Sequence, residues 1–336
     1  MEKATLNIQV DWKLVGAFAD AIEKAHKNGT CLYPGCTDKP IGSHVIARKT
    51  LKLIAENSKV FTWNMPDAWA MYRQFNVSKP MIDLSLVPNL VGINDIRNVT
   101  HPLFCHDHDD RIFAPLEKDE IASRSTFLPE QIVLLAYRAL CSVTYNDTLT
   151  EALLKAIKQH GYTHPLNDPA KYARLLRFRA RDILSKAQQR YEQVHLTRDY
   201  QQLGWSVYPV NVQPCVAATY SFIPNTDDDA PSIVDGAITL SAEDVVSFTL
   251  LPDPRLGKSI CILSWLKGSQ RAQRFMILQG INELSEQERQ DVFFHYAFES
   301  TTIYISPTWW RSLSEVKREE YMKIHQKAGR EHAKLV

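Results

Sequence analysis

The chain has 336 residues, of which 45% are hydrophobic and 23% charged, and its formal net charge is +1. These values predict a globular protein with two or three domains, and they exclude a surface that is basic overall. No apolar run reaches the roughly 18 residues of a membrane span. Six cysteines without a signal peptide predict a protein of the reducing cytoplasm that uses cysteine for metal rather than for disulfides.

The first expected element is an amphipathic helix over residues 12–27, where apolar side chains recur at helical spacing. Asn28-Gly29 ends it, and the run Cys31-Leu-Tyr-Pro-Gly-Cys36 follows. Pro34-Gly35 predicts a tight turn that brings the two cysteines to one point. Gly42 to Ile46 is apolar on one side and predicts a strand that carries His44.

A second motif follows far along the chain, in the run Phe104-Cys105-His106-Asp107-His108-Asp109-Asp110. Cys105 and His108 form a Cys-x-x-His pair at the start of a predicted helix. Thiolate and imidazole ligands suit Zn²⁺, and two such pairs have the spacing of a four-ligand structural zinc site. The alternative is that these cysteines are small buried hydrophobes and that the histidine lies on the surface. The aspartates are in any case favourable at a helix N-terminus.

Together the two motifs resemble the HNH (ββα-metal) endonucleases, in the subset that carries a structural zinc. In that family a Cys pair precedes an acidic residue and a histidine on one strand, and a second pair closes the next strand and opens a helix. The resemblance spans about residues 28–120. It matches the zinc ligands to Cys31, Cys36, Cys105 and His108, and the general base to His44. It implies hydrolysis of phosphodiester bonds with Mg²⁺ or Mn²⁺ as the catalytic metal.

The remaining catalytic positions follow from the same resemblance. Asp109 falls where the family has its last metal-binding histidine, which implies a ligand of the catalytic divalent ion. Asn98 and His101 are the nearest candidates for orienting water, phosphate or metal. Ser43 departs from the pattern, because the family has an acidic metal ligand before the base. If the site is not catalytic, His44 is a structural histidine beside the zinc.

The middle of the chain predicts helices at 128–142 and 148–160, and a longest helix from Asn167 to about Gln193. Three arginines of this longest helix share one face at i, i+3, i+7 spacing: Arg174, Arg177 and Arg181. They are candidates for phosphate contacts. A solvated helix face is the alternative, since a basic stripe is a common surface feature.

From about Gly204 the sequence changes to short runs rich in β-branched and aromatic residues, among them Arg274 to Leu278 and, last, Thr301 to Ile305. The expected fold class is therefore α+β. A zinc-stabilised, HNH-like ββα-metal module covers 1–125, a helical region covers 126–203, and a mostly antiparallel β domain covers 204–336. Residues 64–96 are expected to form an insertion between the two strands of the module.

The leading functional hypothesis is a metal-dependent HNH-type nuclease that acts on nucleic acid, with DNA favoured. By analogy with the family, such a protein would be a component of a restriction or antiphage defence system. The alternative is a catalytically inactive zinc module that recognises nucleic acid or a protein partner. A further alternative makes the domain after Gly204 the docking surface for that partner.

Overall fold

The computed structural model describes residues 29–63, 88–95, 99–117, 127–159, 169–224, 240–253, 257–278, 280–300 and 302–335, together with Asp20, Glu23, Lys24 and Lys27. Within them, the backbone alone is described at 146–159, 169–181, 277–278 and 326–335. Most of the helix expected at 12–27 and most of the insertion expected at 64–96 lie outside the described residues.

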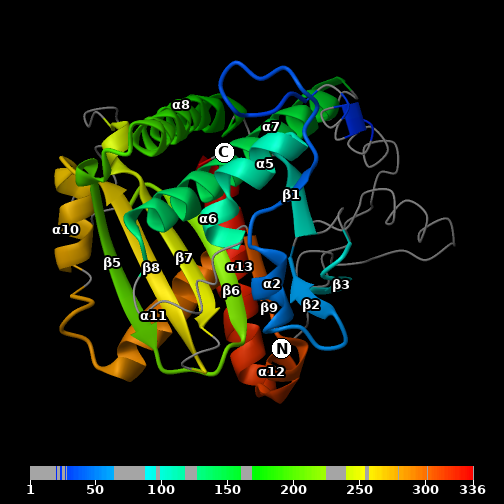
Figure 1. The fold of residues 1–336 in the computed structure, drawn as a ribbon. Coiled ribbons are helices and arrows are strands. Elements are labelled where there is room, and N and C mark those ends of the chain that lie inside the picture. The colour runs from blue at the N-terminus through cyan, green and yellow to red at the C-terminus, as the bar shows by residue number, and fades with distance from the viewer. Residues whose placement is uncertain are drawn as a thin grey trace, which may run out of the picture.

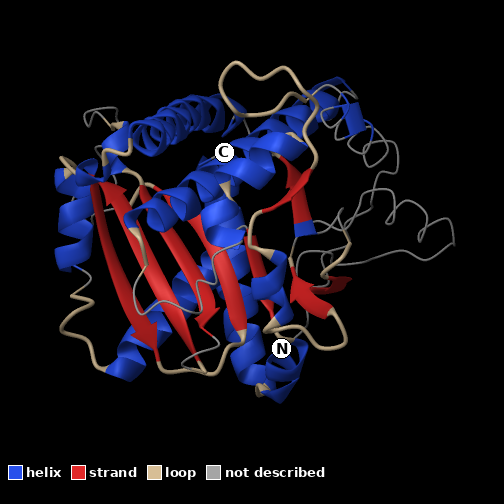
Figure 2. Cartoon of the chain, in the orientation of Figure 1, coloured by secondary structure: helices blue, strands red, loops and turns tan. Residues whose placement is uncertain are grey.

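Strands and helices occur in runs of one to four along the described chain (Figures 1 and 2). The strands are β1 (Gly42–His44), β2 (Lys59–Thr62), β3 (Asn89–Gly92), β4 (Thr100–Pro102), β5 (Leu203–Val210), β6 (Val216–Phe222), β7 (Val246–Asp253), β8 (Lys258–Leu266) and β9 (Thr302–Ile305). The helices are α2 (Arg48–Lys52), α5 (His106–Ile112), α6 (Ala114–Glu117), α7 (Pro129–Gln159), α8 (Pro169–Thr197), α10 (Gln270–Leu278), α11 (Glu286–Glu299), α12 (Pro307–Ser312) and α13 (Glu315–Leu335), with 3₁₀ turns at Tyr200–Gln202 and Ala242–Asp244.

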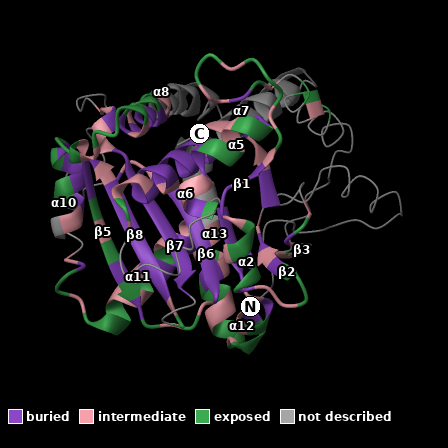
Figure 3. Ribbon diagram, in the orientation of Figure 1, coloured by how far each residue is buried: buried purple, intermediate pink, exposed green. Residues whose placement is uncertain are grey.

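A seven-stranded sheet in the order β3-β2-β9-β6-β7-β8-β5 forms the centre of the molecule, and all of its pairs are antiparallel. Its two faces follow from the alternation of side chains along each strand. On β8, Ile262 packs in a cluster with residues of α7, whereas Cys261 and Leu263 pack in a cluster with residues of α11. The central strands are buried on both faces as a result (Figure 3).

The antiparallel sheet expected after Gly204 is confirmed, but it extends beyond the predicted domain. Strands β2 and β3 come from the first 125 residues, and β2 pairs with β9 through Phe61–Ile305 and Thr62–Tyr304. A hydrophobic cluster that contains Ile46, Val60 and Tyr304 buries this junction. The main sheet and its core therefore continue across both predicted boundaries, 125/126 and 203/204.

Three predicted elements differ from the structure. The helices expected at 128–142 and 148–160 are one helix, α7, since Asn146 and Asp147 cost only tenths of a kcal/mol in a helix that contains no Pro or Gly there. The strand expected from Arg274 to Leu278 is the end of α10. The hydroxyl of Ser269 accepts a hydrogen bond from the Ala272 backbone at 2.9 Å, which caps this helix, and Gln, Arg, Ala and Met are good helix formers.

A second, two-stranded sheet lies beside the large one. Strands β1 and β4 pair antiparallel, with Ser43 opposite His101 and His44 opposite Thr100. Helix α5 begins four residues after β4 ends. Two antiparallel strands followed by a helix thus come together from segments that are far apart in the chain. In the part of the chain that the structure describes, no helix combines the length and the apolar composition that a membrane span requires.

Candidate metal centre and adjacent polar site

The first cysteine pair lies on a tight turn. Gly35 has φ +72°, a backbone conformation that a side chain disfavours, and the Cys36 backbone N–H donates to the Tyr33 carbonyl at 3.1 Å. The Cys31 backbone N–H donates to the Asp38 carbonyl at 2.9 Å and closes the base of the loop. The turn predicted from Pro34-Gly35 therefore holds both thiols on one side.

The loop is joined to the start of α5 by two backbone hydrogen bonds. The Leu32 N–H donates to the Leu103 carbonyl at 2.8 Å, and the Ile41 N–H donates to the Phe104 carbonyl at 2.7 Å. Cys105 is the N-cap of α5, so His108 lies one turn along the same helix. The second pair of side chains is thereby placed opposite the first.

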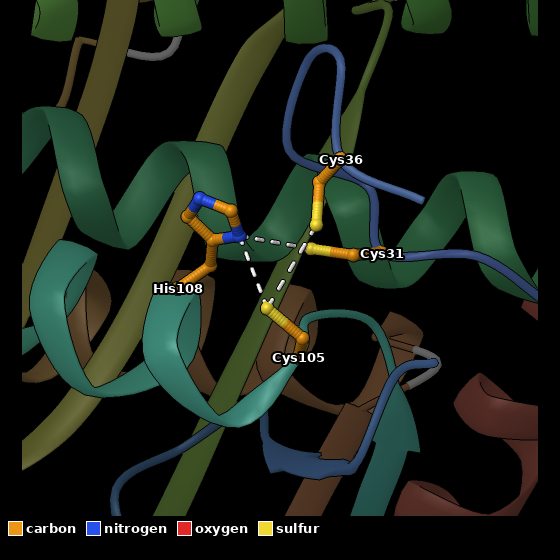
Figure 4. Close-up of side chains that lie close together, drawn as sticks. All are labelled: Cys31, Cys36, Cys105 and His108. Atoms are coloured by element: carbon orange, nitrogen blue, oxygen red, sulfur yellow. Dashed lines mark hydrogen bonds between the residues drawn. The ribbon is translucent and has the colours of Figure 1, made fainter. Parts of the chain in front are cut away.

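Cys31, Cys36, Cys105 and His108 form a cluster that can bind a metal ion such as zinc (Figure 4). Their ligand atoms all lie within 4.8 Å of one another. The Nδ1 atom of His108 is 3.1 Å from the Cys105 Sγ and 3.5 Å from the Cys31 Sγ, and the Cys36 and Cys105 sulfurs are 3.9 Å apart. Tetrahedral zinc, with bonds of about 2.3 Å to sulfur and 2.0–2.1 Å to nitrogen, separates its ligands by roughly 3.6–3.8 Å. These four donors fit that ion.

The Cys36 thiol resists ionisation as long as no cation compensates it. A hydrogen bond to the Asp38 backbone lowers the pKa of Cys36, but desolvation and the neighbouring Cys31 and Cys105 thiols outweigh it and raise the pKa to about 11. A divalent cation bound among them would favour the thiolates. The ring of Tyr33 stacks on His108 with 4.0 Å between ring centroids, which fixes the imidazole that presents Nδ1 to the cluster.

His44, the expected general base, ends β1 and is half-buried. Desolvation, together with the positive charges of Arg138 and Arg48, lowers its pKa, so the ring is neutral at pH 7. The ring also hydrogen bonds to the backbone of Ile93, and its Nε2 is buried without a partner among the described residues. A general base needs a ring nitrogen with a free lone pair, and the buried Nε2 is the candidate for that role.

Asp109, the expected ligand of a catalytic metal, faces a guanidinium. Its Oδ1 is 3.8 Å from an Nη of Arg138, a side chain of α7 that is only 2% exposed. The same Nη donates to Glu117 of α6 at 2.8 Å, and the guanidinium lies 3.8 Å from the ring centroid of Phe113. Burial raises the pKa of Asp109, while Arg138 and the nearby Ser43 hydroxyl lower it.

Mg²⁺ or Mn²⁺ does not fit these residues as they stand. An ion bound to Asp109 would lie about 2.0–2.1 Å from the carboxylate oxygen and hence within roughly 6 Å of the Arg138 guanidinium. Repulsion between a divalent ion and this fixed charge is on the order of 6 kcal/mol at an effective dielectric constant near 20. Ser43 adds a hydroxyl where the resemblance calls for a carboxylate, and Glu117 is already paired with Arg138.

Four polar side-chain atoms on β1, α5 and α7 have no hydrogen-bond partner among the described residues. They are Ser43 Oγ, His44 Nε2, Asp109 Oδ1 and Arg138 Nε, and all four are buried. Buried polar groups are normally paired, so such a concentration indicates a place for a ligand, a water molecule or a reacting group. Asp109 of α5 interacts with Ser43 of β1 and with Arg138 of α7 beside the metal centre, and His44 lies within electrostatic reach of Arg138.

The other expected site residues are less closely involved. His101 lies on β4 and its Nδ1 is 3.0 Å from the hydroxyl of Ser142 on α7, which gives it a structural partner. Asn98 lies outside the described residues. Arg174, Arg177 and Arg181 lie on α8 as expected, but their side chains are outside the described part of the structure.

Sequence reasoning missed Arg138 and Glu117. One signal was present, because Arg138 is the lone charged residue within the apolar run from Ile132 to Cys141. A charge in such a run must be paired when the helix is buried on all sides. The identity of its partners depends on how α5, α6 and α7 pack, which no local pattern encodes.

Comparison with known proteins adds no relative: no family model, no curated protein and no solved structure matches this chain.

Proposed function

We propose that the chain is a zinc-stabilised endonuclease, in which His44 accepts a proton from the water that attacks a phosphodiester bond. One observation carries the proposal. Antiparallel pairing of β1 with β4, followed by α5, brings His44 and Asp109 within the electrostatic reach of the same buried Arg138. This is the strand–strand–helix arrangement that the resemblance to HNH endonucleases implies, with a Cys₃His cluster at its start.

The protonation state of His44 supports this role. A general base near neutral pH must be unprotonated and must expose a lone pair toward the reacting atoms. The lowered pKa of His44 meets the first condition, and its Nε2 makes no hydrogen bond among the described residues. A base of this kind contributes about 10²–10⁴-fold to a hydrolysis rate.

The expected catalytic Mg²⁺ or Mn²⁺ has weaker support than the zinc. A divalent ion would stabilise charge on the scissile phosphate, but its place at Asp109 is next to a guanidinium. The proposal therefore gives it no step. The zinc has a structural role, joining the loop at Cys31 to α5.

A cleavage assay tests the proposal. Supercoiled plasmid, linear duplex, single-stranded DNA and RNA are incubated with zinc-loaded protein in resin-treated buffer, with and without added Mg²⁺ or Mn²⁺. His44→Ala should reduce cleavage by at least about 10²-fold while zinc content is unchanged. His106→Ala is a matched control, because this histidine of α5 has a side chain that is 74% exposed. Equal cleavage by wild type and His44→Ala would remove His44 from the mechanism.

A non-catalytic zinc module is the second candidate, and one observation favours it. The acidic groups nearest His44 are neutralised by Arg138, and Nε2 of His44 is buried. Such a module would bind nucleic acid or a protein partner without hydrolysis. Binding of nucleic acid by both wild type and His44→Ala, with no cleavage by either on any substrate, would favour this candidate. A role in restriction or antiphage defence, and a partner for the C-terminal β region, stay predictions.

A further inference from the structure

We infer that Arg138 is the resident cation of the Asp109 site, and that this site takes no divalent metal. The guanidinium comes from α7, which is not part of the unit formed by β1, β4 and α5. It lies next to the carboxylate at which a catalytic ion would bind. The inference deepens the proposed function, because it assigns the positive charge of the site to an arginine. Only that catalytic consequence rests on the proposed function, since the metal-binding behaviour of the site can be measured in a protein that cleaves nothing.

The first reason is that Arg138 is already paired with the carboxylates of the site. Arg138 is 2% exposed and contacts both carboxylates on offer, Glu117 at 2.8 Å and Asp109 at 3.8 Å. A buried charge of this kind is costly to leave unpaired, so the guanidinium cannot move aside for a second cation without losing both partners. Arg48 of α2 adds a further positive charge within reach of His44.

The second reason is that the surrounding side chains hold the Arg138 guanidinium in place. Arg138 is held on its third side by the ring of Phe113, 3.8 Å from the guanidinium carbon. Together with the pairs to Glu117 and Asp109, this contact fixes the guanidinium beside the Asp109 carboxylate.

Arg138 also accounts for the departure at Ser43. A carboxylate there would add a third acid to Asp109 and Glu117 around one guanidinium, whereas a serine hydroxyl adds none. The Ser43 hydroxyl instead stabilises the Asp109 carboxylate, whose pKa it lowers, and Arg138 Nε is buried with no partner among the described residues. A guanidinium and a hydroxyl together recognise an anionic oxygen, which is the chemistry of a phosphate.

Direct measurement of Mn²⁺ binding tests the inference. Full-length, zinc-loaded protein is titrated with Mn²⁺, and the free ion is followed by its electron paramagnetic resonance signal. Wild type and Asp109→Asn should take up the same small amount of Mn²⁺. Arg138→Met should bind Mn²⁺ at least about tenfold more tightly than wild type, because it removes the repulsive charge. That gain should disappear in the double variant Arg138→Met/Asp109→Asn, and Arg138→Lys should behave as wild type.

Two results would overturn the inference. The first is uptake of one Mn²⁺ by wild type that Asp109→Asn abolishes. The second is a folded, zinc-loaded Arg138→Met that gains no affinity. If Arg138→Met does not fold, the comparison of wild type with Asp109→Asn decides. Failure of the nuclease proposal is separate, because it is read from cleavage and leaves the Mn²⁺ titration unaffected.

Discussion

Replacement of Cys105 by serine should release zinc and detach the Cys31–Cys36 loop from α5. Cys105 Sγ lies 3.1 Å from His108 Nδ1 and 3.9 Å from Cys36 Sγ, so it contacts a ligand from each half of the cluster. Loss of a direct ligand should lower zinc affinity by more than the roughly 10–100-fold that loss of an outer partner costs. The two backbone hydrogen bonds that otherwise join the loop to residues 103–104 contribute only about 2 kcal/mol together. Structural zinc supplies about 10–16 kcal/mol in small modules.

The assay combines elemental analysis of gel-filtered protein with hydrogen exchange. In wild type the amides of Leu32 and Ile41 should exchange slowly, because they donate to Leu103 and Phe104. In Cys105→Ser both should exchange rapidly and the zinc content should fall toward zero. Cys215→Ser is the matched control, since Cys215 is a buried thiol of the other core cluster and belongs to no metal cluster in the described residues. It should lose about 1–3 kcal/mol of stability but keep its zinc.

The reasoning is refuted if Cys105→Ser retains a full equivalent of zinc, or if Cys215→Ser loses zinc to the same extent. Slow exchange of Leu32 and Ile41 in a zinc-free Cys105→Ser would show that the backbone alone holds the loop.

Three further predictions concern charge. Desolvation and the charges of Arg138 and Arg48 lower the pKa of His44. As pH is lowered, the cleavage rate should therefore begin to fall only below the usual histidine pKa of about 6.5. A rate that already falls while pH is still above 7 would contradict this. Burial raises the pKa of Glu192 from 4.5 to about 7, although a hydrogen bond with Tyr137 acts in the opposite direction. The protonated carboxyl therefore favours the folded state below pH 4.5, and this contribution to the free energy of unfolding should be lost as pH rises through about 7. Glu192→Gln should flatten that decline and be about 1–2 kcal/mol more stable than wild type at pH 8, after allowance for solvent access, as melting curves between pH 4 and 8 can show. Reversal of Arg174, Arg177 and Arg181 to Glu should weaken nucleic-acid binding and lower its salt dependence by about one unit per lost contact, whereas an unchanged salt slope would mean a solvated helix face.

Local chemistry explains what could be predicted from the sequence. The four metal-ligand candidates were identified from spacing alone, because a turn at Pro34-Gly35 and one turn of helix between Cys105 and His108 fix each pair over a few residues. Helix α8 was also expected, because its helical sequence pattern extends over many turns. Antiparallel pairing of the C-terminal strands followed from the turn residues between them.

Long-range packing explains what could not. Arg138 lies on α7, whereas Asp109 lies on α5 and Glu117 on α6. They are in contact because α7 packs over these two helices. The pairing of β2 with β9 joins segments at opposite ends of the chain, and no local pattern specifies it. Helix α10 was mistaken for a strand because the apolar run Phe275 to Leu278 is too short to show its period, and the cap at Ser269 was overlooked.

X-ray absorption at the zinc edge of the purified protein tests the central claim most directly, because it reports the ligands of the bound ion. We predict one zinc per chain, with three sulfur ligands at about 2.3 Å and one nitrogen ligand at about 2.0–2.1 Å. In Cys36→Ser, one of the three sulfur ligands should be lost. Absence of zinc in freshly purified protein, or a coordination shell of oxygen and nitrogen without sulfur, would contradict it.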